Sequence, residues 1–292
     1  MKASDETNSH KVILLGGRSR AAAAIREELG GEHCIGVVRS GPGERDVATP
    51  DYAQVPGNLD LAGATIVNCV GTPLGDTDAL MRLNRDVPLA WAEAGREQGA
   101  RGFVHISSFS IFGPVEAVDS STPTRPMSDY GRSKLAAERA LGESNLPDFP
   151  IAMLRVPILV GGGPDKLSQL VSLGSRTGFI PSASRPTPRS MLPYGGLARA
   201  VRLAIEGRLD GPVHAADPEP FTPQMLREEA AKQGRRIRIA RLPRPATALI
   251  AKTAPGLHAS LLAPNLLAGE ANLIANETGY ERLRDVVARL LA

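Results

Sequence analysis

A tyrosine and a lysine stand four positions apart in DYGRSKLAAERAL, residues 129–141. The apolar spacing of this stretch predicts a helix. Residues i and i+4 of a helix lie on one face, so Tyr130 and Lys134 can present a phenol and an ammonium to the same pocket. A phenol has a pKa of about 10, and a neighbouring positive charge favours the phenolate. The spacing therefore predicts a proton-transfer pair, and the alternative is a solvated helical turn with a packed tyrosine.

Strand and helix patterns alternate along the first half of the chain. Short β-branched apolar runs predict strands at 11–15, 34–38, 64–70, 102–108 and 151–156, and helical apolar spacing predicts helices over 20–29, 78–99 and 129–144. This alternation is typical of an α/β fold with a doubly wound parallel sheet, which binds ligands at the carboxyl ends of its strands. After residue 157 the pattern loosens into Gly, Pro and Ser, which predicts a smaller C-terminal lobe.

The composition is that of a globular protein. Of 292 residues, 42% are hydrophobic and 22% charged, and no apolar run approaches the ~20 residues of a membrane helix. The polar residues 1–10 do not resemble a signal peptide, so we expect a soluble, cytoplasmic protein that binds no membrane. The net charge of +3 gives no support to nucleic-acid binding. Cys34 and Cys69 fall in predicted strands and imply neither a disulfide nor a metal site.

A glycine pair follows the first predicted strand in VILLGGRSRAAAAI, residues 12–25. Backbone N–H groups and the positive end of the next helix would receive a pyrophosphate there, and a tight strand-to-helix turn is the plainer interpretation. In VVRSG, Arg39 stands where NAD-binding folds place an acidic residue for the ribose 2′-hydroxyl. An arginine at this place, with Arg18 and Arg20 nearby, suits a 2′-phosphate and favours NADP, whereas a solvated arginine is the alternative.

Three longer motifs follow in order: GFVHISSFSIFG (102–113), STPTRPMSDYGRSKLAAERAL (121–141) and AMLRVPILVGGG (152–163). In order and spacing they resemble the extended short-chain dehydrogenases, which are NAD(P)-dependent nucleotide-sugar epimerases, reductases and dehydratases. The resemblance implies a Rossmann domain over 11–160, with 187–207 packing back on it, and a smaller substrate-binding lobe formed by 161–186 and 208–292. The glycine turn resembles the GxxGxxG fingerprint of the family, but its three positions hold Gly16, Ser19 and Ala22.

The resemblance also assigns site residues by position. It implies that Ser108 is a catalytic residue and a substrate contact, which donates a hydrogen bond to the substrate oxygen. Tyr130 is the residue that moves the proton, and Lys134, the third catalytic residue, reaches the cofactor ribose as well. The alternative is that Ser108 only caps a strand. The cofactor contacts that we expect are Gly16, Arg18, Ser19, Arg20, Ala22, Arg39, Ser40, Asn58, Leu59, Val70, Gly71, Tyr130, Lys134 and Pro157. Asn58 and Leu59 belong to a GNL turn near the adenine, and Pro157 to a loop under the nicotinamide.

Two polar residues, His105 and Asn84, fall within predicted elements. His105 lies within a predicted strand, where a buried imidazole is expected rather than a catalytic one. Asn84 resembles the family asparagine that steadies the active-site helix, and a solvated helix residue is nearly as good an explanation. Further along, GRRIRIARLPR (234–244) alternates arginine with apolar residues, as a solvated edge strand would.

The last motif concerns the substrate. Arg189, in TPRSMLPYGGLARAV (187–201), resembles the family arginine that contacts the diphosphate of a UDP- or dTDP-sugar, although Gly195 and Gly196 replace the usual acidic pair. Family dehydratases carry an Asp-Glu pair beside the catalytic Ser or Thr, and SSFSIFG lacks it. We therefore expect hydride transfer at C4 of a nucleotide-sugar by a reductase or epimerase, with NADP as cofactor, NAD as the alternative, and a homodimer as one expected assembly. The alternative function is a non-catalytic, NADP-sensing protein of the same fold, which the loss of two glycines suggests.

Overall fold

The structure is a computed structural model that describes residues 11–144, 148–183, 188–253 and 265–292. The chain forms two compact units, each made of several segments. The first comprises Met1–Ile106, Ala136–Met153 and Val201–Gly211, and the second comprises Ser107–Leu135, Leu154–Ala200 and Pro212–Ala292. The domain boundaries predicted from the sequence concern what each part binds, and they remain a prediction.

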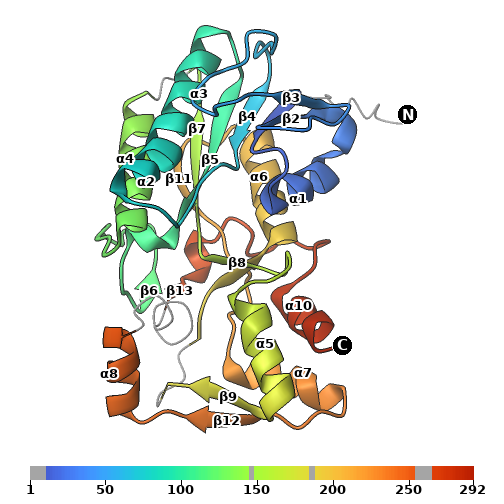
Figure 1. Cartoon of the computed structure of the whole chain (residues 1–292), viewed down its shortest axis with the longest axis vertical. Helices are drawn as coiled ribbons and strands as arrows, with labels where there is room; N and C mark the ends of the chain where they lie inside the picture. The colour runs from blue at the N-terminus through green and yellow to red at the C-terminus, as the bar shows by residue number, and fades with distance from the viewer. Residues whose placement is uncertain (1–10, 145–147, 184–187, 254–264) are drawn as a thin grey trace. The chain divides into compact units, whose positions relative to one another are not determined.

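The main sheet has seven strands in the order β11-β7-β5-β4-β1-β2-β3 (Figure 1). They are β1 (Val12–Leu15), β2 (Cys34–Val38), β3 (Asp46–Ala48), β4 (Thr65–Asn68), β5 (Gly102–Ser108), β7 (Ile151–Val156) and β11 (Gly211–His214). The pairs β1 with β2, β1 with β4, β2 with β3 and β4 with β5 are parallel. The strand order reverses at β1, so the predicted doubly wound Rossmann fold is confirmed. The carboxyl ends of β1 and β4 mark the point where such sheets bind ligands.

Helices of the first unit cover both faces of the sheet. They are α1 (Arg20–Leu29), the 3-10 turn η1 (Gly31–His33), α2 (Thr77–Met81), the π-helical turn η2 (Arg82–Asp86) and α3 (Val87–Glu97), while α4 (Asp129–Glu143) and α6 (Tyr194–Glu206) belong to both units. In Figure 1, α3 and the end of α4 lie on one side of the strands, and α1 and the end of α6 on the other. In the core of this unit Trp91 is completely buried and donates its indole N–H to the carbonyl oxygen of Tyr52 (2.7 Å).

The second unit holds three two-stranded parallel sheets among its described residues. They are β8 (Ile158–Val160) with β10 (Met191–Pro193), β9 (Phe179–Ser182) with β12 (Arg238–Arg241), and β6 (Ala117–Val118) with β13 (Leu266–Leu267). The helices are η3 (Phe109–Ile111), α5 (Lys166–Thr177), α7 (Pro223–Lys232), α8 (Arg244–Thr253), η4 (Gly269–Ala271) and α10 (Leu283–Leu291). One apolar cluster joins α5, α7 and α10 to β9 and β10, and a second forms around η3, β6 and β13. None of the described helices is long and apolar enough to cross a membrane.

The helix predicted over 78–99 is interrupted by the π-helical turn η2. Pro88 explains the interruption, because it lacks an N–H and its ring would clash with the carbonyl of Asn84, four residues earlier. Strand β3 was not predicted from the sequence, because its three residues are half-buried or exposed and show no apolar run. Both cysteines are free thiols.

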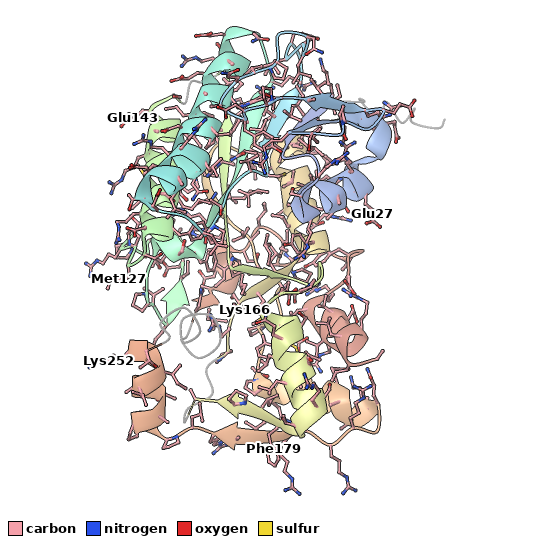
Figure 2. The ribbon with its side chains drawn as sticks, in the orientation of Figure 1. Glu27, Met127, Glu143, Lys166, Phe179 and Lys252 are labelled. Carbon is pink, nitrogen blue, oxygen red and sulfur yellow. The ribbon has the colours of Figure 1, made fainter. Side chains whose placement is uncertain are left out.

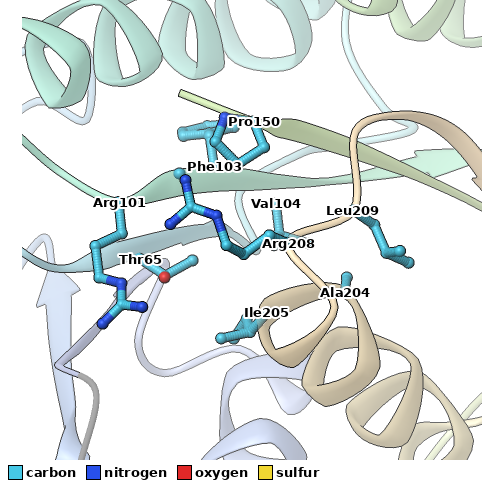
Figure 3. Close-up of a pocket in the computed structure, with 10 residues that line it drawn as sticks. Thr65, Arg101, Phe103, Val104, Pro150, Ala204, Ile205, Arg208 and Leu209 are labelled. Atoms are coloured by element: carbon cyan, nitrogen blue, oxygen red, sulfur yellow. The ribbon is translucent and has the colours of Figure 1, made fainter. Parts of the chain in front are cut away.

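Helix α6 ends in a turn of the Schellman type. The N–H of Leu209 donates to the oxygen of Ala204 (3.0 Å), and the N–H of Arg208 donates to that of Ile205 (3.2 Å). The turn holds Arg208 at φ 45°, and no other described non-glycine residue has a positive φ. This left-handed conformation usually takes glycine. Figure 3 shows the side chain of Arg208 lining a pocket together with that of Arg101.

We expect Arg208→Gly to raise the free energy of unfolding by about 1 kcal/mol, because glycine removes the strain of the left-handed conformation. Urea unfolding measures the change. Arg208→Ala is the matched control, since it removes the same side chain but keeps the strain, and it should give no gain. A glycine variant less stable than the wild type would mean that the contacts of the Arg208 side chain outweigh the backbone strain.

Candidate active site

The second unit brings Ser108 and Tyr130 together. Ser108 ends β5 and caps η3, where its Oγ accepts the N–H of Ser110 (3.2 Å). A side-chain hydrogen bond joins Ser108 to Tyr130. The two hydroxyl groups are therefore adjacent, although they lie 22 positions apart in the sequence. Two groups that contact the same substrate oxygen need to be adjacent in this way.

The start of α4 is fixed by a cap and by a close backbone approach. Ser128 Oγ accepts the N–H of Gly131 (3.0 Å), which is the pattern of an N-cap. A Cβ on Gly131 would lie 2.5 Å from the carbonyl oxygen of Ser110 and 3.0 Å from Cβ of Pro126. Only glycine allows the first turn of α4 to approach η3 this closely. Gly131 therefore positions Tyr130 beside Ser108.

Burial raises the pKa of Tyr130 above its usual value, and the hydrogen bond with Ser108 lowers it by a smaller amount. The influence of Lys134 on the phenol, which the sequence led us to expect, remains a prediction. At neutral pH Tyr130 is a protonated phenol and can donate a proton.

Lys134 follows Tyr130 by one turn of α4 and is only 4% exposed. The neighbouring Ser133 is also buried and donates its hydroxyl proton to the carbonyl oxygen of Tyr130 (2.9 Å). Because Lys134 is buried, the alternative of a solvated helical turn is wrong. The contact of Lys134 with the cofactor ribose remains a prediction.

In the first unit, the glycine turn after β1 is constrained in two ways. Gly16 has φ 75°, and a Cβ there would lie 3.0 Å from Cγ2 of Val70. A Cβ on Gly17 would lie 2.6 Å from Cα of Gly36 in β2. Both glycines donate their N–H groups to the oxygen of Val37 (3.1 and 3.0 Å). The turn therefore sits against the carboxyl ends of β2 and β4, at the reversal point of the sheet.

Ser19 and Ala22 occupy the other two fingerprint positions. Ser19 Oγ caps α1 by accepting the N–H of Ala22 (3.1 Å), and Ala22 is completely buried. The cap uses one of the N–H groups that a pyrophosphate would otherwise receive at the helix end. The next residue, Arg20, is exposed. The Ser19 cap therefore leaves one N–H group fewer for a pyrophosphate at this turn.

Arg18, Arg39 and Ser40 are exposed beyond the ends of β1 and β2. A Cβ on Gly41 would lie 3.2 Å from Nη2 of Arg18, so the Arg18 side chain reaches across to the segment that follows β2. A hydrogen bond joins the backbone of Arg39 to the hydroxyl of Tyr52. The two arginines that we expect to bind a 2′-phosphate thus belong to adjoining segments.

Asn68 and His105 are completely buried at paired positions of β4 and β5. Their Nδ2 and Nδ1 atoms lie 3.1 Å apart, and Asn68 Oδ1 accepts the N–H of Val70 (3.1 Å). His105 is therefore a buried strand residue, as expected, and its ring contacts the Asn68 amide. Asn68 in turn orders the loop after β4, which carries the predicted contacts Val70 and Gly71.

Asn84 holds the same loop from the other side. Its side chain accepts the N–H of Thr72 and donates to the carbonyl oxygen of Thr72, each at 2.9 Å. Asn84 is completely buried, so the alternative of a solvated helix residue is wrong. These contacts steady the loop after β4, and the role of Asn84 in steadying the active-site helix, which the family resemblance suggested, remains a prediction.

The remaining predicted cofactor contacts lie in loops. Asn58 is exposed, while the side chain of Leu59 packs in the core of the first unit. In the second unit, Pro157 is buried between β7 and β8. Their roles toward a cofactor remain predictions.

Arg189 is only 5% exposed, and its backbone pairs with Phe221 in both directions (3.0 and 2.7 Å). Burial lowers the pKa of its guanidinium to about 10. A buried positive charge is stabilised by a nearby anion. The contact between Arg189 and the diphosphate of a nucleotide-sugar remains a prediction.

Leu192 and Tyr280 crowd the second glycine of the pair that follows Arg189. A Cβ on Gly196 would lie 2.8 Å from Cδ1 of Leu192 and 3.1 Å from Cε2 of Tyr280, whereas a Cβ on Gly195 would make an ordinary contact at 3.4 Å from Cβ of Tyr280. Packing therefore accounts for glycine at position 196 but not at position 195. Burial raises the pKa of Tyr280 to about 12.

Sequence reasoning missed Gly131 and Asn68, and it identified Gly17 only as part of a glycine pair. The two glycines matter because a second segment approaches them closely, and a single stretch of sequence contains no sign of that contact. Asn68 did carry a signal, because a polar residue inside the apolar run ATIVNCV needs a hydrogen-bond partner when buried.

Known proteins share both the sequence pattern and the fold. Residues 60–177 match the sequence model of the NAD dependent epimerase/dehydratase family. No curated protein matches the chain. Among solved structures, a putative epimerase from Burkholderia cenocepacia has a TM-score of 0.74 at 15% identity, with 97% of each chain covered.

Two further structures contain a cofactor. The human epimerase family protein SDR39U1 with NADPH has a TM-score of 0.73 at 18% identity and covers 96% of this chain and 98% of its own. MoeE5 in complex with UDP-glucose and NAD has a TM-score of 0.70 at 18% identity and covers 96% of this chain and 97% of its own. At these identities the structures support the fold, while the matched residues 60–177 contain Ser108, Tyr130 and Lys134. Residues 60–177 are thus similar to the NAD dependent epimerase/dehydratase family, and the chain has the fold of these solved structures.

Proposed function

We propose that the chain is an NADP-dependent oxidoreductase of the extended short-chain dehydrogenase type that transfers hydride at C4 of a nucleotide-sugar, as a reductase or an epimerase. The observation that carries the proposal is the hydrogen bond between Ser108 and Tyr130, with Lys134 buried one turn later. No carboxylate follows Ser108 in SSFSIFG, which disfavours dehydration. The cytoplasmic location and the homodimer expected from the sequence remain predictions.

In the direction of reduction, Tyr130 gives its phenolic proton to the carbonyl oxygen while hydride adds to the carbonyl carbon. A ketone thereby becomes a secondary alcohol, and NADPH, when bound, supplies the hydride and is oxidised to NADP⁺. Ser108 donates a hydrogen bond to the same oxygen and stabilises the charge that develops on it. The raised pKa of Tyr130 supports this direction, because the phenol is protonated before the reaction.

Turnover separates this enzyme from the NADP-sensing alternative. Purified protein is mixed with NADPH and a UDP- or dTDP-4-keto-sugar, and the loss of reduced nicotinamide is followed by absorbance. An epimerase is detected with UDP-sugars and a catalytic amount of oxidised cofactor, by analysis of the sugar products. Binding of NADP without turnover of any of these sugars would favour the sensor.

We expect NADP to bind more tightly than NAD, and Arg39→Asp to reverse that order. A charge-assisted hydrogen bond is worth about 1.5–3 kcal/mol, which is about ten- to a hundredfold in affinity. Titration calorimetry with both cofactors measures the order. Arg45→Asp is the control, because Arg45 is an exposed arginine of the same region that we do not place in the site. Equal or tighter binding of NAD to the wild type would contradict the prediction.

Arg189→Ala should weaken binding of UDP or dTDP by at least about a hundredfold and leave NADP binding within about threefold. Loss of one partner of a desolvated charge pair costs several kcal/mol, because the other charge stays buried and unpaired. Calorimetry with the NADP-loaded protein gives both constants. If UDP and dTDP both fail to bind the wild type at millimolar concentration, the dehydrogenase chemistry of Tyr130 still stands, but the nucleotide-sugar substrate does not.

A further inference from the structure

A basic groove lies along α7 and β12 in the second unit. Five arginines line it: Arg227, Arg235, Arg236, Arg238 and Arg241. Glu228 is the one acidic residue of the lining, and its carboxylate already lies 3.3 Å from the guanidinium of Arg284. The whole chain has a net charge of only +3, so positive charge is concentrated in this groove.

The charge of these arginines is available to a partner. All five are exposed, and none of them forms an ion pair with another described residue. The nearby Lys232 differs, because its ammonium lies 2.7 Å from the carboxylate of Glu229. Arg235 makes one long hydrogen bond, to Ser175 Oγ (3.4 Å). The groove therefore presents positive charge that the described part of the chain does not neutralise.

Strand β12 also has an open edge. It pairs with β9 on one side, where Arg238 and Leu242 donate their N–H groups to Gly178 and Ser182 (2.8 Å each). Successive residues of a strand direct their backbone groups to alternate edges. Ile239 therefore points its N–H and C=O away from β9, toward the edge that no described strand covers. Figure 2 labels Phe179, which begins β9 on the paired side.

The buried side of β12 is anchored, so the open edge is held in place. Ile237 is only 5% exposed and packs in the apolar cluster of α5, α7 and α10, with Ile239 packed against the same cluster. The groove is open to solvent. An open trough of this kind is unlike the closed pockets that bury small ligands, and it suits an extended chain.

We propose that the basic groove binds an extended acidic segment of another protein, which adds to the free edge of β12 as a further strand. Main-chain hydrogen bonds to β12 would give affinity, and the five arginines would select Asp and Glu side chains. Nucleic acids and anionic membranes also attract arginine, but neither makes use of an unpaired strand edge. A third explanation is that the arginines only protect the edge from pairing with other strands.

A peptide of alternating Glu and Thr, labelled with a fluorophore, is the first probe, and binding is measured by fluorescence anisotropy. The second probe replaces each Thr by Pro, which keeps the charge but removes alternate N–H groups and prevents strand pairing. The full chain should bind the Glu-Thr peptide at least tenfold more tightly than the Glu-Pro peptide. Polyphosphate, a single-stranded oligonucleotide and anionic vesicles are measured in parallel.

Charge reversal tests the arginines. Arg236→Glu with Arg238→Glu should weaken binding of the Glu-Thr peptide at least tenfold, since each reversal replaces attraction by repulsion. Arg96→Glu with Arg139→Glu makes the same change of charge on exposed helix positions of the first unit and should leave binding unchanged. Circular dichroism checks folding, and Arg227→Glu on α7 replaces the double variant if β12 does not tolerate it.

Three results would overturn the proposal. Equal binding of the Glu-Thr and Glu-Pro peptides would mean that charge alone acts, as would tighter binding of the oligonucleotide, polyphosphate or vesicles. Equal losses in the groove and control variants would move the interaction elsewhere. Absence of binding to the wild type would leave the arginines with the protective role only.

Discussion

Tyr130→Phe is expected to lower kcat for keto-sugar reduction by about a hundred- to ten-thousandfold, which is the usual contribution of a positioned general acid. The variant keeps the ring and loses only the oxygen that holds the transferred proton. Ser108 would still be able to donate to the substrate oxygen, so binding of substrate should change little. Affinity for NADP should stay within about fivefold, because a lost neutral hydrogen bond costs about 1 kcal/mol or less. Steady-state assays and a fluorescence titration with NADPH give these values.

Tyr280→Phe is the matched control for this variant. The hydroxyl of Tyr280 is buried and makes no hydrogen bond within the described residues. Its removal should therefore leave kcat unchanged and should not lower stability, since a buried hydroxyl without a partner is unfavourable. Wild-type turnover in Tyr130→Phe would remove Tyr130 from the mechanism. An equal loss in both variants would mean that the assay reports general damage to the second unit.

The sequence predicted the sheet well because the signal for a parallel sheet is local. Runs such as CIGVV and IAMLRV are apolar at nearly every position, since both faces of the strand are covered, and their bounds agree with β2 and β7. The three-residue strand β3 had no such run. Strand β3 forms through a short backbone pairing with β2. This pairing depends on the neighbouring strand rather than on the composition of β3.

Part of the site was predictable because it, too, depends on local features of the sequence. The types and spacing of Tyr130 and Lys134 are local features, and burial of Lys134 agrees with them. The upward shift of the Tyr130 pKa was not predictable, because desolvation depends on what surrounds the side chain in three dimensions. The need for glycine at position 131 likewise comes from Ser110, which is far from it in the sequence.

Gly131→Ala is expected to lower kcat by about a hundredfold without unfolding the protein. The new Cβ would lie 2.5 Å from the carbonyl oxygen of Ser110, closer than such atoms approach, so the first turn of α4 must move away from η3. Tyr130 lies in that turn, and its hydrogen bond with Ser108 would lengthen. A displacement of about 1 Å in a catalytic group commonly costs about a hundredfold in rate. Steady-state assays measure kcat, and urea unfolding measures stability.

Gly142→Ala separates this positional effect from the effect of alanine on the helix. Gly142 belongs to the same helix, and nothing lies within 4 Å of a Cβ built there. Alanine should stabilise the helix by about 0.5–1 kcal/mol at that position and leave kcat unchanged. At position 131 the same helical gain is offset by the clash, so Gly131→Ala should lose activity without a matching gain in stability. If Gly131→Ala instead keeps wild-type kcat, the packing of α4 on η3 does not set the distance between Tyr130 and Ser108, and that distance must be controlled by Ser128 and its cap.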